Sequence, residues 1–262
     1  MSTTPTRVGL STASVYPEPA ERAFELAAEL GYDGIELMVW NDPVSQDPDA
    51  VRHLKHKYGV PVLSIHAPCL FVTQRVWGRD PWLKVRRSAA AAALLKARTV
   101  ALHPPFRWQR SYAAEFVEGV KAIENEFQIN IAVENMFPLR MRDRPVATYK
   151  PGWDVVLQGH ASYTLDTSHT SVSRSDAMQM ALEMGSALKH LHIADGTGRN
   201  NDEHLVPGRG DQPCAQVLRY VADLVSCTAV IVEVNTHGPV GSRSRVDDLT
   251  EALAYCREHL DQ

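Results

Sequence analysis

The sequence predicts a single α/β domain of the (β/α)8, or TIM, barrel class, and three observations lead to this prediction. Short β-branched apolar runs alternate with longer amphipathic runs along the chain. Eight such pairs fit into 262 residues, at about 33 residues each, which is the number that closes a parallel barrel. No linker rich in proline and glycine divides the chain, so residues 1–262 are expected to form one domain.

The expected strands begin near residues 8, 34, 61, 99, 129, 162, 188 and 229. Helical patterns cover residues 19–30, 82–97, 112–127 and 247–260, and Gly31 suits the end of the first helix. A weaker pattern covers residues 150–158. The structural alternative is an open doubly wound sheet, but the first strand-to-helix turn lacks GxGxxG and the chain contains no Walker A motif.

Composition excludes several classes of protein. With 44% hydrophobic and 22% charged residues, the chain is neither disordered nor collagen-like. Its most apolar stretch, residues 89–95, is about a third of the length needed to span a membrane, and residues 1–7 contain no apolar run typical of a secretory signal. We therefore expect a cytoplasmic protein without membrane partners. The net charge of −4 gives no overall attraction to nucleic acid, although a local basic groove remains compatible with it.

The four cysteines argue against a disulfide framework or a thiolate zinc site. They are far apart in the sequence and form no CxxC pair: Cys69, Cys214, Cys227 and Cys256.

Potential metal ligands stand at the carboxyl ends of six consecutive expected strands, where barrel enzymes place their chemistry. Asp, Glu and His are a minority of the chain, with 31 acidic residues and 11 histidines among 262, so six in succession are improbable by chance. A single such histidine would be interpreted as a hydrogen-bonded core residue, whereas the set indicates a site. The six residues are His66, His103, Glu134, Asp166, His192 and Glu233.

Further candidates follow the strands at short offsets. His169 lies three residues after Asp166, and Asp202 and His204 share one side of an extended segment. His190 should point inward one layer below His192, as a core or supporting residue. The turn at residues 207–211 has glycines that permit a close backbone approach, and it is a weaker candidate for phosphate contact. The remaining histidines considered are interpreted as solvated surface: His53, His56, His160 and His259.

Nitrogen and carboxylate ligands suit zinc, manganese, cobalt or magnesium, and five histidines favour zinc or another transition metal. Nine ligands are too many for one ion, but two or three ions that share bridging carboxylates would accommodate them.

The motifs resemble those of the xylose isomerase-like TIM-barrel superfamily, which includes sugar epimerases and isomerases, inosose-processing enzymes and endonuclease IV (AP endonuclease family 2). The resemblance covers nearly the whole chain, from residue 8 to residue 260. Its motifs are Ser64-Ile-His-Ala-Pro, Leu102-His-Pro, Val133-Glu-Asn-Met, Leu165-Asp-Thr-Ser-His, His190-Leu-His-Ile-Ala-Asp, His204-Leu-Val-Pro-Gly-Arg-Gly and Val232-Glu-Val.

The resemblance implies two possible metal centres. Epimerase-like members hold one metal with residues that match Glu134, Asp166, His192 and Glu233, and the two glutamates move a substrate proton. Endonuclease IV adds five ligands to hold three zinc ions, and these match His66, His103, His169, Asp202 and His204. All nine are present here, whereas the usual epimerase often carries an arginine at the Asp202-x-His204 position.

The loops differ from those of endonuclease IV. The loops after strands 2 and 3 are apolar and aromatic and lack donors that would hold opened DNA. They favour an isomerase or epimerase, or a related lyase, acting on a small sugar, sugar phosphate or inosose. The predicted substrate-binding residues are Trp40, Phe71, Trp108, Phe137 and Arg209.

The alternative is a zinc phosphoesterase that acts on abasic DNA, supported by the nine ligands. A basic run at residues 139–144, with Arg107 and Arg110, would supply phosphate contacts in that case, although a phosphorylated sugar could use the same arginines. A binding protein without turnover is a third class, and no ligand is missing that would favour it.

Overall fold

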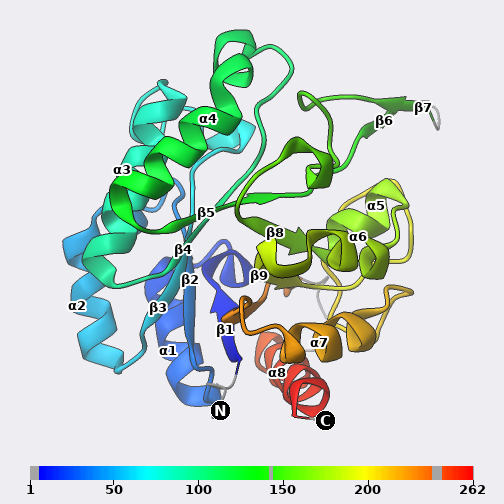
Figure 1. The fold of residues 1–262 in the computed structure, drawn as a ribbon. Coiled ribbons are helices and arrows are strands. Elements are labelled where there is room, and N and C mark those ends of the chain that lie inside the picture. The colour runs from blue at the N-terminus through cyan, green and yellow to red at the C-terminus, as the bar shows by residue number, and fades with distance from the viewer. Residues whose placement is uncertain (1–5, 142–143, 238–243, 262) are drawn as a thin grey trace.

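Eight parallel strands form a closed barrel, as the sequence predicts. The computed structural model describes residues 6–141, 144–237 and 244–261, and Figure 1 shows the strands surrounded by helices. Around the barrel the strand order is β1-β10-β9-β8-β5-β4-β3-β2. The strands are β1 (Arg7–Ser11), β2 (Gly34–Met38), β3 (Val62–His66), β4 (Thr99–Leu102), β5 (Asn130–Glu134), β8 (Tyr163–Asp166), β9 (Leu188–Ile193) and β10 (Ala229–Val232).

The helices pack on the outside of this barrel, and two of them show clear start and stop signals. Asp47 caps the first turn of α2 with its side chain and Pro48 occupies the first helical position. Gly31 ends α1 in the left-handed conformation, with φ +82°, as its position predicts. The helices are α1 (Ala20–Leu30), α2 (Pro48–Tyr58), α3 (Pro81–Leu95), α4 (Arg110–Phe127), α5 (Thr167–Ser173), α6 (Ala177–Met184), α7 (Cys214–Asp223) and α8 (Arg245–Leu260).

The segment between β5 and β8 differs from the expected helical unit. Residues 150–158 contain only a 3-10 turn, Val156–Gln158, and an antiparallel hairpin of β6 (Leu139–Met141) and β7 (Arg144–Val146) precedes it. Figure 1 shows the hairpin extending away from the barrel. Prolines at 138, 145 and 151 remove backbone donors from the segment between β5 and β8, so no helix continues through these positions.

The lower barrel interior is apolar and closely packed. A register shift between Ile35 and Glu36 leaves Leu63 as an extra residue of β3, close to Gly34 of β2 and Gly9 of β1. A Cβ on Gly34 would lie 2.6 Å from Leu63, and one on Gly9 would lie 2.7 Å from Ile231, so these side chains use the space that the glycines leave. The polar layers of the barrel therefore lie above this floor, toward the carboxyl ends of the strands.

No helix among the described residues is both long enough and apolar enough to cross a lipid bilayer.

His160 is buried, which corrects its prediction as a surface residue. It is 7% exposed, its ring packs 5.4 Å from that of Phe116 and 5.9 Å from that of Tyr163, and neither ring nitrogen has a hydrogen-bond partner among the described residues. Its position before β8 turns the ring into the helix–sheet core. By contrast, His53 and His56 are exposed and His259 is half-buried.

This burial predicts an acid-sensitive contribution to stability. Burial lowers the pKa of His160 from 6.5 to about 4, so the folded protein binds fewer protons than the unfolded chain between these values. The contribution of this shift to the free energy of unfolding is fully present above pH 6.5, and it falls by about 3 kcal/mol as the pH drops to 4. In urea unfolding measured between pH 7 and pH 4, the free energy of unfolding of His160→Leu should therefore rise relative to that of wild type as the pH falls. The variant His53→Leu, at an exposed position, should follow wild type. Parallel curves for wild type and His160→Leu would contradict the prediction.

Candidate metal centre and substrate cavity

The structure brings all nine predicted ligands together at the carboxyl end of the barrel. His66, Glu134 and Asp166 are the last residues of β3, β5 and β8. His192 is the second-to-last residue of β9, and His103 and Glu233 directly follow β4 and β10. The helix α5 and the loop after β9 add the remaining three ligands, His169, Asp202 and His204.

Glu134 lies at the centre of this cluster and is 1% exposed. Its Oε2 is 3.3 Å from His66 Nε2 and 3.2 Å from His103 Nε2. Its Oε1 is 3.2 Å from His169 Nδ1 and 3.3 Å from His192 Nδ1. One carboxylate thus faces four imidazoles, an arrangement in which it could bridge two ions.

The two glutamates differ in their electrostatic surroundings. Burial raises the pKa of Glu134, but the nearby His192 and His103 outweigh burial and hold that pKa well below its usual range. Burial also raises the pKa of Glu233, and there the opposing effects of His192 and His204 are too small to reverse it. The two carboxyl groups therefore differ in proton affinity before any metal binds.

Asp166 connects its strand to the first turn of α5. Its Oδ1 accepts a hydrogen bond from the backbone N–H of His169 at 2.7 Å, which caps the helix. Its own N–H donates to the Asn135 side chain at 2.7 Å. The cap fixes His169 so that its Nε2 lies 3.3 Å from Asp202 Oδ2.

Asp202 and His204 contact each other and are both held by Ser168 of α5. His204 Nε2 lies 2.9 Å from Asp202 Oδ2. The His204 N–H donates to Ser168 Oγ at 3.1 Å, and the same hydroxyl donates to Asp202 Oδ1 at 2.6 Å. These bonds support His204 at φ +45°, a left-handed conformation that is unusual for a residue with a side chain.

The histidine rings are oriented as metal-binding histidines usually are. Three have Nδ1 beside a backbone carbonyl oxygen: His66 at 3.1 Å from Ala67, His169 at 2.8 Å from Asn135 and His204 at 2.7 Å from Glu233. An Nδ1–H that donates there leaves the Nε2 lone pair for a metal.

His192 is turned the other way, with its Nδ1 rather than its Nε2 toward the other ligands. Its Nε2 lies 3.0 Å from Glu36 Oε1, and its Nδ1 lies 3.1 Å from Glu233 Oε2. A carboxylate behind a ligating imidazole fixes the tautomer and strengthens the ligand.

The donor set fits divalent metal ions. Glu134 Oε2 and Asp166 Oδ2 are buried and accept no hydrogen bond within the part of the chain that the structure describes. Several triplets place their ligand atoms within 4.8 Å of one another, among them His66–Glu134–His192, Asp166–His169–His204 and Asp166–His192–Glu233. Buried carboxylates without donors are costly unless a cation compensates them, so these residues could hold a metal.

Glu36 is a central residue of the site that the sequence prediction missed. It is fully buried in β2, and Oε2 lies 2.7 Å from His190 Nε2 and accepts a hydrogen bond from Ser64 Oγ at 2.8 Å. His190 therefore supports the layer below His192, as predicted. The signal in the sequence that could have indicated Glu36 was a glutamate within an expected strand that is otherwise apolar.

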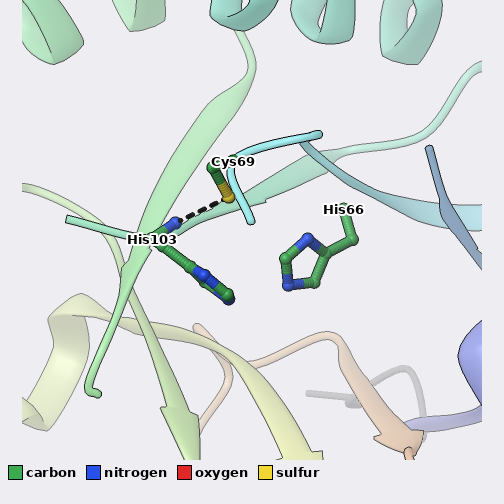
Figure 2. Close-up of side chains that lie close together, drawn as sticks. All are labelled: His66, Cys69 and His103. Atoms are coloured by element: carbon green, nitrogen blue, oxygen red, sulfur yellow. Dashed lines mark hydrogen bonds between the residues drawn. The ribbon is translucent and has the colours of Figure 1, made fainter. Parts of the chain in front are cut away.

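Cys69 also lies in the cluster, although the spacing of the cysteines argued against a thiolate site. Its sulfur and one nitrogen each of His66 and His103 lie within 4.8 Å of one another. Figure 2 shows the three side chains close together. Burial raises the pKa of the Cys69 thiol, but His103 and His66 outweigh burial and lower the pKa from 9 to about 5.

A cavity of about 920 Å³ opens above the ligands. Trp40 lines it, with its ring 5.8 Å from that of Tyr16. Phe137 is half-buried, with its ring 4.9 Å from His169. His237, which the sequence prediction overlooked, also lines the cavity. The cavity thus combines an acidic, histidine-rich floor with aromatic walls.

The other predicted substrate contacts are placed differently. Trp108 lines an adjoining cavity of about 760 Å³ and stacks on Phe106 at 4.5 Å. The side chain of Phe71 lies outside the described part of the structure, as do those of the arginines of the 139–144 run. Arg107 is exposed and lies 3.5 Å from the Ala147 carbonyl oxygen.

Arg209 is not brought to the metal cluster, which corrects its prediction as a substrate contact. Its guanidinium forms ion pairs of 2.7 Å with Asp248 and Glu251 of α8. The surrounding glycine-rich turn wraps Asp195, whose carboxylate accepts from the N–H groups of Gly208 and Gln212 at 2.9 Å. These backbone donors are used within the protein, so the turn is structural.

Comparison with known proteins assigns the chain to a family. The family model described as the xylose isomerase-like TIM barrel matches residues 24–259, and the chain belongs to this family. An uncharacterized protein of Mycobacterium tuberculosis (strain ATCC 25618 / H37Rv) is 50% identical over 97% of this chain and 98% of its own.

Two more distant similarities name activities. Fructoselysine 3-epimerase of Escherichia coli O157:H7 is 23% identical, over 83% of this chain and 86% of its own. The crystal structure of an AP endonuclease, family 2, from Brucella melitensis has a TM-score of 0.71 and 18% identity, covering 95% of this chain and 99% of its own. The structural similarity shows the shared fold alone.

Proposed function

We propose that the protein is a metal-dependent isomerase or epimerase that acts on a small sugar, sugar phosphate or inosose. The observation that carries this proposal is the lining of the 920 Å³ cavity, which among its described residues includes no lysine or arginine. Its acidic residues, including Glu18 and Asp42, would repel a polyanionic backbone, whereas a polyol could hydrogen-bond to them. The similarity to fructoselysine 3-epimerase supports the same class of reaction.

In this proposal Glu134 and Glu233 carry the proton. Metal held by Glu134, Asp166, His192 and Glu233 would supply Lewis-acid polarisation of a hydroxy-carbonyl substrate. One glutamate removes the proton beside the carbonyl and the other returns one to the same carbon or its neighbour. Trp40 and Tyr16 cover the apolar face of the sugar and exclude water from the reacting carbon.

The adjoining cavity supports a charged end on the substrate. It shares Leu70, Val72 and His103 with the first cavity, and its lining includes Arg75, Arg79 and Lys84. A sugar phosphate could place its ring over the metal ligands and its phosphate toward these cations.

The second candidate is a zinc phosphoesterase of the abasic endonuclease type. The complete nine-residue ligand set favours it, because a single-metal epimerase leaves His66, His103, His169, Asp202 and His204 without a direct role. Two or three ions would generate hydroxide and stabilise the attacking and leaving oxygens.

His204→Ala separates the two candidates. In the epimerase, His204 lies outside the four proposed ligands, so we expect kcat to fall by no more than about 10–100-fold, the scale for a residue behind a ligand. In the phosphoesterase it is a ligand, so its loss should remove both an ion and the activity. The metal content is measured by elemental analysis of wild type and His204→Ala purified without added metal. The activity is measured with ketose, inosose and abasic-DNA assays on the same proteins. Three zinc ions per chain and cleavage of abasic DNA that His204→Ala abolishes would overturn the epimerase proposal.

A further inference from the structure

Cys69 lies beside two of the predicted ligands, in a position that neither proposed reaction uses. It lies on the loop after β3, three residues beyond His66, and Figure 2 shows its side chain pointing into the space between His66 and His103. The ligand atoms of these three residues lie within 4.8 Å of one another. The sulfur is also fixed from two sides, because it lies 3.1 Å from the Ala67 carbonyl oxygen and accepts from the backbone N–H of His103 at 3.4 Å.

Buried atoms without partners lie on or beside the same two histidines. Glu134 Oε2 is 3.3 Å from His66 Nε2 and 3.2 Å from His103 Nε2, yet it accepts no hydrogen bond from any described residue. His103 is 5% exposed, and its Nδ1 has no hydrogen-bond partner among the described residues either. The unpartnered His103 Nδ1 requires a ligand that the described residues do not provide, and a cation held by His103, His66 and the Cys69 sulfur meets that requirement.

We infer that Cys69 is a thiolate ligand of a metal ion held with His66 and His103, which gives this part of the centre a mixed set of sulfur and nitrogen ligands. The inference rests on the metal centre of the proposed function and adds a ligand beyond the nine that the sequence predicted. On binding, the thiol proton leaves to solvent and a sulfur–metal bond forms, with no change in oxidation state. A thiolate selects zinc or cobalt over magnesium and manganese, which prefer oxygen ligands.

Cobalt(II) provides a direct probe, because a cobalt–thiolate bond gives near-ultraviolet charge-transfer absorption that nitrogen and oxygen ligands do not. Cobalt chloride is titrated into the metal-stripped full chain of wild type, Cys69→Ser and Cys227→Ala. Cys227 is the matched control, because it is a buried thiol that precedes β10 at the opposite end of the barrel.

The expected result is a near-ultraviolet band in wild type and Cys227→Ala that disappears in Cys69→Ser. Cobalt affinity should fall at least about tenfold in Cys69→Ser, the scale found when even a residue behind a ligand is removed. Visible cobalt bands without the near-ultraviolet band in wild type would overturn the thiolate ligand and leave the proposed function intact. Absence of cobalt binding to wild type would overturn the metal centre and the proposed function together.

A second measurement needs no variant and therefore does not depend on the folding of Cys69→Ser. Cys69 is half-buried and lines the 760 Å³ cavity, whereas the other three cysteines are buried. Iodoacetamide should alkylate Cys69 in the metal-free protein, and cobalt should suppress the reaction at least about tenfold, as measured by peptide mass spectrometry. Equal alkylation with and without bound cobalt would overturn the inference.

Discussion

Glu134→Gln and Glu233→Gln are each expected to lower kcat by about 10²–10⁴-fold, the contribution of a positioned general acid or base. Glutamine preserves the volume of the side chain but cannot accept or return a proton. Glu134 is in contact with four histidines, so its substitution should also weaken metal binding. Steady-state kinetics on the ketose or inosose that wild type converts measures the effect.

Exchange of solvent deuterium into the substrate separates the two roles. A variant that lacks the base should incorporate no deuterium at the reacting carbon, whereas one that lacks only the returning acid should exchange without completing the conversion. Glu118→Gln, at an exposed position on α4, is the matched control and should retain wild-type turnover. An active Glu134→Gln/Glu233→Gln double variant would contradict the assignment of both residues.

The barrel could be predicted because its evidence is local and repeated. The run at 229–232 consists of apolar residues, as expected for a strand covered on both faces, and the structure places β10 there. The segment between β5 and β8 could not be predicted in the same way. Its hairpin depends on the pairing of Leu139 with Val146, and periodicity carries little information about so short a contact.

The cluster of nine candidate metal ligands was predictable because strand ends of a parallel barrel converge. The position of Asp166 at the end of β8 and that of His192 near the end of β9 follow from the fold class alone. Side chains held by long-range partners were not predictable. Arg209 was expected at the substrate, but its direction is determined by Asp248 and Glu251, about 40 residues further along the chain.

Glu36 shows most clearly what only three-dimensional contact reveals. Nothing in its local sequence indicates its partners, because His190 is 154 residues away and Ser64 is 28 residues away. Burial raises the pKa of Glu36, but His192 and His190 outweigh burial and hold the pKa well below its usual range. The carboxylate is therefore ionised inside the barrel, and its neighbours provide the compensation that a buried charge requires.

Removing this carboxylate should be costly to the fold. Glu36→Leu leaves the Ser64 hydroxyl and His190 Nε2 buried without their acceptor. It also removes the carboxylate that pairs with His192 Nε2 at 3.0 Å, and breaking a buried ion pair in this way costs about 3–5 kcal/mol. Glu36→Gln retains the volume and one acceptor oxygen, so it should lose less. Urea unfolding of metal-stripped protein at pH 7 compares the variants without the stabilisation that bound metal adds.

The same substitutions should weaken the metal centre as well. His192 presents Nδ1 to Glu134 and Glu233 while its Nε2 faces Glu36. Without the Glu36 carboxylate, the imidazole ring of His192 is no longer held in this orientation. Loss of a residue behind a ligand typically costs about 10–100-fold in metal affinity, and zinc affinity of Glu36→Leu measured by competition with a chelator should fall by this factor. A Glu36→Leu protein with wild-type stability and zinc affinity would show that the buried carboxylate neither supports the fold nor positions His192.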